Sequence, residues 1–287
     1  LFLKYIYYFL RGNIHILEKG FKGAGLKHIS KGYISDIKIP LPPLDHQKKI
    51  AAILDAVDAY KQKTKVLIEK YDELTQSLFL DMFGDPVTNP KRWKELPLST
   101  SIDLIIDYRG KTPPKSKSGI PLLSSANVQD GKIDLSYEQY ISVENYKNWI
   151  VRGLTKPGDL LFTTEAPVTE VALIPNDGNK YQISRRVMAL RFMKNKINNF
   201  YALHLMMQKN WSERLKKLTR GSTVPRLLKP DILKQLLIVP PIELQNQFAK
   251  RIKAIEAQKA QAQASLAQAD DLFNSLLQRA FKGELAA

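Results

Sequence analysis

Two stretches of the sequence repeat one pattern: IPLPPLDHQKKIAAIL at residues 39–54 and LIVPPIELQNQFAKRI at residues 237–252. Each contains an apolar run, two prolines, an acidic residue and a glutamine, in that order. A shift of 198 residues places Pro42–Gln47 on Pro240–Gln245 without a gap. The repetition predicts that the same structural junction occurs twice in the chain.

The repeat extends beyond these two stretches. The same shift places Phe2–Phe9 on Phe200–Met207 and Gly23 on Gly221. A unit of this length is far longer than the 20–50 residues of a solenoid repeat. The chain therefore contains one whole unit, preceded by the end of another.

A long helix is expected after each pair of prolines. Pro43 and Pro241 close an extended run, and the acidic residue that follows suits the first turn of a helix, where the helix dipole is positive. No proline or glycine interrupts residues 44–83, and a helix of that length spans roughly 60 Å.

Apolar residues recur along both segments at nearly heptad spacing, with Thr64 as a weak position. Because most helix stability comes from packing an apolar face, the two helices are expected to pack side by side. The alternative is two separate amphipathic helices, each lying on its own globular domain. The residues predicted to form the packing surface are Ile50, Ile53, Val57, Leu67, Leu74, Leu78, Phe248, Ile252, Ile255, Leu266, Phe273 and Leu276.

The net charge of +16 is concentrated in the middle of the chain. Residues 88–240 carry 25 Lys/Arg and 13 Asp/Glu, whereas residues 241–287 are close to neutral. A basic domain joined to a neutral segment is typical of a protein that binds the phosphate backbone of a nucleic acid. A basic surface that serves solubility is the alternative.

The segment between the helices reads as short strands separated by turns, with one helical stretch at residues 199–218. The sequence thus predicts an α+β fold: a globular domain with a twisted sheet, and two long helices packed as an antiparallel coiled coil. The predicted organisation is a domain remnant at 1–40, a helix at 41–85, a globular domain at 86–239 and a second helix at 240–287.

No motif for catalysis emerges. The GKT at residues 110–112 lacks the glycine of a phosphate-binding loop five residues earlier, where Ile105 stands. Leu41 and Val239 precede the prolines where an amino-methyltransferase would need Asn or Asp. Asp107 with Asp130 and Lys132 only loosely resembles a metal-dependent nuclease signature, which stays open as a rival enzyme hypothesis.

Metal and redox chemistry also find little support in the sequence. The chain has no cysteine, which excludes disulfides and thiolate ligands and fits a cytoplasmic location. The four histidines show no metal-ligand spacing. Apolar runs are too short to span a membrane, and no secretory signal is visible.

The chain resembles the specificity (S) subunits of type I restriction-modification systems. The resemblance rests on the duplicated PLPPLDHQKKIAAILD and VPPIELQNQFAKRI, on the closing LLQRAFKGEL, and on phrases of the middle domain such as KPGDLLFTTEAP and GSTVPRLLKPDILKQLLI. In that family two target recognition domains lie at opposite ends of two antiparallel helices, and each reads one half of a bipartite DNA site.

The resemblance implies a DNA reader that is not itself catalytic. It implies double-stranded DNA and methyltransferase (M) subunits as partners, with restriction (R) subunits bound through them. Cofactors would lie in those partners: S-adenosylmethionine, ATP and Mg, with none bound by this chain. A rigid helix of roughly 60 Å is long enough to fix two half-sites about one DNA turn, roughly 34 Å, apart.

The residues expected to contact DNA are loop cations, hydroxyls and amides, the groups that hold phosphates and base edges. Glu165 is included because a carboxylate can accept a hydrogen bond from a cytosine amino group. The candidates are Arg109, Lys111, Lys115, Lys117, Ser124, Ser125, Asn127, Thr163, Thr164, Glu165, Arg185, Arg186, Arg220, Ser222, Thr223 and Arg226.

The sequence departs from the family pattern at its start, where most of a first recognition domain would precede Phe2. Either the chain is a fragment, which Leu1 favours, or it is a shortened subunit that pairs with a second copy. Besides the nuclease, a coiled-coil scaffold whose basic domain binds acidic protein remains as an alternative function.

Overall fold

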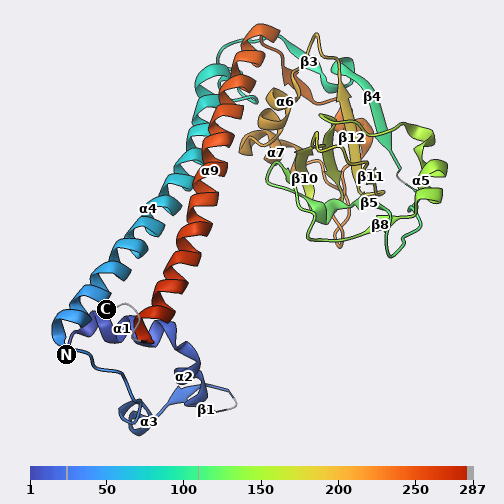
Figure 1. Ribbon diagram of the computed structural model, residues 1–287. Coiled ribbons are helices and arrows are strands. Elements are labelled where there is room, and N and C mark those ends of the chain that lie inside the picture. The colour runs from blue at the N-terminus through green and yellow to red at the C-terminus, as the bar shows by residue number, and fades with distance from the viewer. Residues whose placement is uncertain (24, 109, 283–287) are drawn as a thin grey trace. The chain divides into compact units, whose positions relative to one another are not determined.

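The computed structural model describes residues 1–23, 25–108 and 110–282, and its fold is α+β, as predicted (Figure 1). The chain forms two compact units. One is Leu1–Glu73 together with the chain from Ile255 onward, and the other is Leu74–Ala254. The domains predicted from sequence follow the linear order of elements, whereas in the structure each unit takes part of both long helices.

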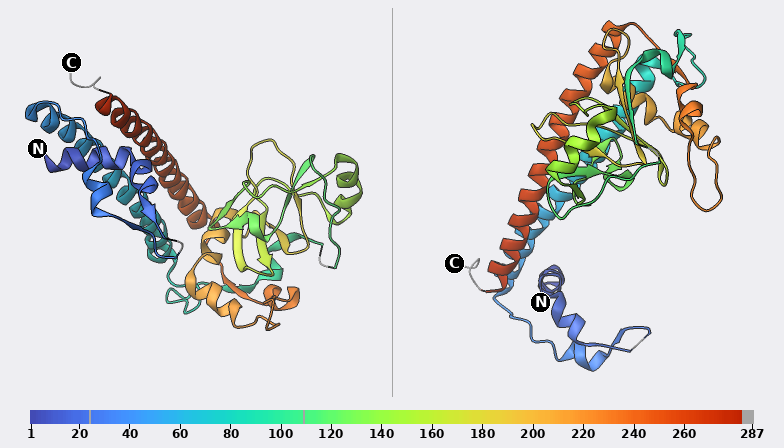
Figure 2. Two further views of the ribbon diagram at one scale, coloured as in Figure 1. Left: turned by 90° about the horizontal axis from the view of Figure 1, so that it is seen from below. Right: turned by 90° about the vertical axis from the view of Figure 1, so that its right-hand side faces the viewer.

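The two long helices are α4 (Leu44–Phe83) and α9 (Ile242–Phe281), 40 residues each, and both confirm the helices expected after the prolines. They lie side by side in Figures 1 and 2. Within the first unit, Lys61 pairs with Asp270 and Lys259 pairs with Asp72, so the helices are antiparallel.

The packing surface between α4 and α9, here called the seam, follows a strict heptad. Its positions on α4 alternate steps of three and four residues, and α9 has the same positions shifted by 198. All are buried or half-buried. On α4 the seam comprises Gln47, Ile50, Leu54, Val57, Lys61, Thr64, Ile68, Tyr71, Thr75, Leu78 and Met82; on α9 it comprises Gln245, Phe248, Ile252, Ile255, Lys259, Ala262, Leu266, Ala269, Phe273, Leu276 and Ala280.

Three residues expected in the packing surface are misplaced. Ile53, Leu67 and Leu74 are 41, 43 and 48% exposed, one position away from the seam. Two polar residues, Lys61 and Thr64, hold seam positions here; the sequence pattern included Thr64 as a weak position but not Lys61. The other nine predicted packing residues occupy the seam.

The repeated glutamine explains the repeated motif. Gln245 is fully buried, and its Nε2 donates to Pro240 O at 2.8 Å and to Lys196 O at 3.0 Å. Its Oε1 accepts from Asn198 N at 2.9 Å, at the start of α6 (Asn199–Met206). One side chain thereby joins the prolines, the long helix and a short helix that follows the sheet.

Gln47 makes the equivalent bonds in the other unit. Its Nε2 donates to Pro42 O at 2.7 Å and its Oε1 accepts from Phe2 N at 2.9 Å, at the start of α1 (Leu3–Gly12). Phe2 therefore corresponds to Asn198, an offset of 196. The ungapped alignment of this helix at 198 is wrong by two residues.

The tyrosine of each short helix confirms the corrected offset. Tyr5 Oη donates to Pro40 O at 2.9 Å, and Tyr201 Oη donates to Ile238 O at 2.8 Å. Both carbonyls belong to the extended run before the prolines. The same contacts thus anchor a short helix to the junction in each unit.

The sheet of the second unit has four antiparallel strands in the order β10-β9-β12-β4. Met188 pairs with Asp107, Val187 with Thr163, and Val168 with Thr164. The ends of β4 and β9 and the starts of β10 and β12 therefore share one end of the sheet. The bounds are β4 (Ile102–Asp107), β9 (Leu160–Thr164), β10 (Val168–Leu173) and β12 (Val187–Phe192).

Smaller sheets and helices complete the structure. The second unit contains β3 (Glu95–Pro97), β5 (Ile120–Leu123), β6 (Val128–Gln129), β7 (Lys132–Ile133), β8 (Tyr140–Ile141), β11 (Gln182–Ile183), β13 (Leu236–Ile238), α5 (Val143–Trp149), α7 (Lys209–Lys216) and α8 (Lys229–Leu233). The first unit contains α2 (Ile14–Lys19), β1 (Phe21–Lys22), β2 (His28–Ile29) and α3 (Lys31–Ser35).

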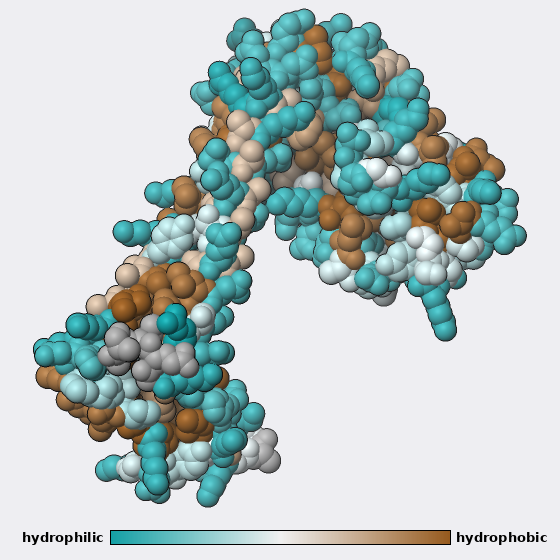
Figure 3. All heavy atoms as spheres, in the orientation of Figure 1, coloured by the Kyte–Doolittle hydropathy of each residue, from teal (hydrophilic) through white to brown (hydrophobic). Residues whose placement is uncertain are grey.

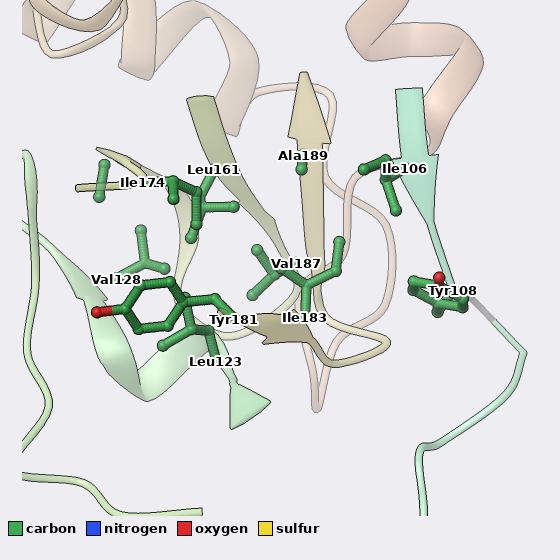
Figure 4. Close-up of a cluster of buried hydrophobic side chains, with 11 residues drawn as sticks. Ile106, Tyr108, Leu123, Val128, Leu161, Ile174, Tyr181, Ile183, Val187 and Ala189 are labelled. Atoms are coloured by element: carbon green, nitrogen blue, oxygen red, sulfur yellow. The ribbon is translucent and has the colours of Figure 1, made fainter. Parts of the chain in front are cut away.

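The core of the second unit lies between the four-stranded sheet and the three-stranded sheet β11-β5-β8. Leu161 and Val187 of the larger sheet pack with Leu123 and Ile183 of the smaller one, and Tyr181 closes the cluster (Figure 4). Along the described chain, no helix has both the length and the apolar content that membrane crossing requires.

Replacing Gln245 with alanine is expected to lower the free energy of unfolding by about 2–4 kcal/mol, because buried backbone groups lose their partners. The control Gln247→Ala removes an exposed glutamine two residues along α9 and should change stability by less than about 0.5 kcal/mol. Urea denaturation measures both, and equal effects would contradict the assigned role.

His204 gives the fold a defined pH dependence. It is buried in α6 against the ring of Phe248, at 5.5 Å between ring centroids, and burial lowers its pKa to about 4. In the unfolded chain His204 binds a proton near pH 6.5, whereas in the folded chain it stays neutral until about pH 4. The free energy of unfolding should therefore fall by about 3 kcal/mol as the pH drops from 6.5 to 4. His204→Phe should remove this part of the decline. Thermal melts at pH 7, 5.5 and 4 measure both.

Candidate nucleic-acid interface

Four loops meet at the end of the sheet where β4 and β9 finish. They are the loop after β4 (residues 110–119), the β9–β10 turn (165–167), the segment before β12 (184–186) and the hairpin at 220–226. Strand pairing brings the first three together, since Asp107, Thr164 and Val187 share this end of the sheet. The candidate site is built from these loops.

The hairpin is attached to the sheet through its backbone. Arg220 and Arg226 exchange both backbone hydrogen bonds at 2.9 Å, and Leu227 N donates to Thr164 O at 2.8 Å. Gly221 has φ +92° and lies where a Cβ would come within 2.8 Å of Val224 O, so the turn requires glycine. The hairpin is thereby held beside Glu165.

Ion pairs organise the charges of these loops. Arg186 Nε lies 3.3 Å from Glu165 Oε2, and Arg220 lies 3.2 Å from Asp231. Arg185 and Arg226 are exposed and form no ion pair within the ranges that the structure describes. The site therefore has more cations than anions, and its free guanidinium groups face solvent.

Several other predicted contacts are also exposed. Lys111, Lys115 and Lys117 lie in the loop after β4, and Ser222 and Thr223 lie at the hairpin tip. Arg109 falls outside the described residues. These exposed donors belong to the same group of loops as the guanidinium groups of the site.

Two candidates in the segment after β5 are buried and serve the fold. Asn127 Oδ1 accepts from Ser124 N at 2.9 Å, and its Nδ2 donates to Asp134 O and Tyr137 O, both at 2.8 Å. Ser125 Oγ is buried and donates to a backbone carbonyl at 3.2 Å. Ser124 is half-buried and bonds Asn127. The prediction of DNA contact is corrected for Ser125 and Asn127, since short polar side chains also close turns.

The two threonines of β9 are likewise internal. Thr163 is fully buried and its Oγ1 accepts from Glu170 N at 2.9 Å, while Thr164 is buried and donates to Arg186 O at 3.3 Å. Because both side chains are buried, the prediction that they contact DNA is corrected. Thr164 instead positions the backbone of Arg186.

Glu165 has a different neighbour from the one expected. Its carboxylate is half-buried and already bound to Arg186. The isolated bridge to Arg226 holds its backbone to the hairpin. Glu165 is therefore placed to orient Arg186, and a nucleic-acid base would have to share that carboxylate.

Sequence reasoning missed Lys229 and considered Asp107 only for a nuclease, whereas their charged atoms lie 3.9 Å apart at the same end of the sheet. It also missed Arg152, which donates to Asp107 O and lies 5.8 Å from the ring centroid of Tyr108. They lie far apart in sequence, so no local pattern could have grouped them.

The residues of the loose nuclease pattern lie on separate elements. Asp107 ends β4, whereas Asp130 has φ +50° in the turn between β6 and β7, and Lys132 begins β7. Among the residues with described positions, no group of three His, Cys, Asp or Glu could hold a metal ion.

A basic loop cluster on an antiparallel sheet, joined to paired long helices, defines a recognition module attached to a helical scaffold. The family model for the type I restriction modification DNA specificity domain matches residues 1–70 and 103–268. The chain belongs to this family.

Individual specificity subunits are similar to the chain in sequence. The chain is 25% identical over 268 residues to the type I restriction enzyme MjaVIII specificity subunit of Methanocaldococcus jannaschii, covering 88% of this chain and 63% of the relative. It is 25% identical to the EcoBI specificity subunit of Escherichia coli, covering 99% and 66%. The chain thus spans about two thirds or less of these relatives.

Solved structures show the same fold. The HsdS subunit from Thermoanaerobacter tengcongensis matches with TM-score 0.54 and 20% identity, covering 98% of this chain and 70% of that one. The type I restriction-modification S subunit from M. genitalium matches with TM-score 0.62 and 17% identity, covering 98% and 73%.

Arg186→Ala should weaken binding of the chain to duplex DNA by at least about tenfold, because it removes a cation and leaves Glu165 unpaired facing phosphate. The control Lys194→Ala removes an exposed lysine after the opposite end of β12 and should change affinity by less than about twofold. Fluorescence anisotropy at fixed salt compares the two; equal losses would contradict the placement of the site.

Proposed function

We propose that this chain is a DNA-recognition component of a type I restriction-modification complex. Its loop cluster would read one half of a bipartite duplex site, and its paired helices would assemble with methyltransferase subunits and, through them, restriction subunits. The chain itself performs no catalysis in this proposal. S-adenosylmethionine, ATP and Mg would be used by the partner subunits, and the complex would act in the cytoplasm.

The observation that carries the proposal is the convergence of four loops at one end of the sheet. Arg185 and Arg186 come from one segment and Arg226 from another, distant in sequence, and strand pairing and the hairpin bring the two segments together. Arginine is the side chain that most often reads guanine in the major groove, through paired hydrogen bonds. The excess positive charge of residues 88–240 supports contact between the DNA phosphates and the surface around these arginines.

Coexpression of the chain with the methyltransferase subunit of its own system, followed by sequencing of methylated adenines, tests the proposal. A single bipartite motif is expected, and purified complex should bind that motif at least ~1000-fold more tightly than random DNA at moderate salt. Methylation without a motif, or binding that does not discriminate, would contradict it. Cleavage by the chain alone with Mg, abolished by Asp130→Ala, would favour the nuclease instead.

Glu165→Gln tests how the site discriminates. Neutralising this residue frees Arg186 and removes a repelling charge, so binding to random duplex should strengthen by about threefold while preference for the recognised motif falls by about tenfold. Glu170→Gln is the control on the neighbouring strand. Competition assays with specific and random duplexes would contradict the role if both variants keep the wild-type ratio.

A further inference from the structure

The hairpin at 220–226 has a counterpart in the first unit, formed by β1 and β2 and here called the first hairpin. Lys22 pairs with His28 in the first hairpin as Arg220 pairs with Arg226 in the second unit, and both pairs are antiparallel. The 198-residue shift of the repeat places each residue of one pair on its equivalent in the other. The same hairpin therefore occurs in both units.

A glycine sets the turn of each hairpin. Gly23 has φ +108°, and a Cβ on it would come within 2.5 Å of Leu26 O. Gly221 has φ +92° and the equivalent approach to Val224 O. A left-handed backbone conformation beside a carbonyl this close requires glycine. The geometry of the turn is thus repeated together with the sequence pattern.

Helices α2 and α3 hold the first hairpin in place. The ring of Tyr33 in α3 packs so closely on Gly20 that a Cβ there would come within 2.4 Å of it, and the side chain of Ile29 lies against the same position. Tyr33 Oη also donates to Ile16 O in α2 at 2.7 Å. The base of the hairpin is therefore fixed within the first unit.

The surface of the first hairpin combines positive charge with an apolar side chain. Lys22, Lys27 and His28 are exposed, and neither lysine forms an ion pair among the residues whose positions are described. Leu26 is 91% exposed. Figure 3 shows mostly hydrophilic side chains, with hydrophobic ones between them, where Figure 1 labels β1. Such a surface fits a partner that is negatively charged and partly apolar.

The residue types decide which groups of DNA the first hairpin fits. In the second unit the paired positions hold arginines, and a guanidinium can bond guanine through two parallel hydrogen bonds. Lys22 instead carries a point charge on a flexible chain, which suits phosphate oxygens. The deoxyribose between the phosphates offers carbon atoms to Leu26. Phosphate and sugar contacts position a protein on the duplex but carry no sequence information.

We propose that the first hairpin is a second DNA-binding site, which contacts the duplex backbone without reading bases. Lys22, Lys27 and His28 contact phosphates, and Leu26 packs against deoxyribose. The repeat then uses one backbone shape for two tasks, since the hairpin at 220–226 belongs to the loops that read bases. The inference rests on the proposed function, which supplies duplex DNA as the ligand.

Lys22→Ala is expected to weaken binding of the full chain to the recognised motif and to random duplex by the same factor, about three- to tenfold at moderate salt. It should also reduce the slope of log affinity against log salt by about one, because one phosphate contact is lost. The control Lys49→Ala removes the same charge from an exposed position of α4 in the same unit and should change either affinity by less than about twofold. Fluorescence anisotropy over a range of salt concentrations measures both variants.

Leu26→Ser tests the apolar contact. It should weaken binding to both duplexes by about threefold and leave the salt slope unchanged. The control Leu41→Ser replaces another exposed leucine of the same unit and should leave both affinities within about twofold of wild type. Both side chains are exposed in the free chain, so thermal melts of the two variants should match the wild type.

A photoreactive residue at position 26 should crosslink to duplex DNA of either sequence, and one at position 41 should not. Losses or crosslinks confined to the recognised motif would show that the first hairpin reads bases, and equal effects of each variant and its control would show that it does not contact DNA. Either result overturns the inference. A wild-type chain that binds DNA without preferring any sequence would contradict the proposed function, whereas the same variants would still test the first hairpin on random duplex.

Discussion

The register between α4 and α9 is the constraint on which the rest of the structure depends, and two seam lysines, Lys61 and Lys259, help to set it. Lys61 Nζ lies 2.5 Å from Asp270 and 4.5 Å from the ring centroid of Phe273, and this lysine holds the pKa of Asp270 below its usual value. Lys259 pairs with Asp72 at the equivalent positions of the repeat. A seam lysine displaced by a heptad would lose its carboxylate, so a shifted register costs more than the same shift in an apolar seam.

The repeat uses one set of contacts twice and varies what is attached to it. Gln47 and Gln245 join the prolines to a short helix in the same way, and Tyr5 and Tyr201 donate to equivalent carbonyls of the repeat, Pro40 O and Ile238 O. In the second unit the short helix α6 is buried and packs on β9 and β10. In the first unit α1 has no described four-stranded sheet to cover. The same junction therefore joins a domain to a long helix in both units. The loops take no part in the junction, so they can differ between domains and determine specificity.

The sequence predicted the helices and the class of fold because proline pairs, uninterrupted apolar periodicity and an internal repeat are local signals. It placed the basic loops correctly on one domain, but it could not separate exposed donors from buried ones. Asn127 and Thr163 have side chains of the types that contact DNA. Their burial follows from strands brought together over long sequence distances, which no local pattern reveals. The seam was misread at Ile53, Leu67 and Leu74 because the polar seam residues Lys61 and Thr64 interrupt the apolar pattern.

The register claim is tested most directly by a double-mutant cycle on Lys61 and Asp270. Unfolding free energies of the wild type, Lys61→Met, Asp270→Asn and the double variant isolate the coupling between the two charges. A coupling of at least about 1 kcal/mol, falling little at high salt because Lys61 is buried, is the result that the structure predicts. Additivity within about 0.3 kcal/mol would contradict a register set by these pairs.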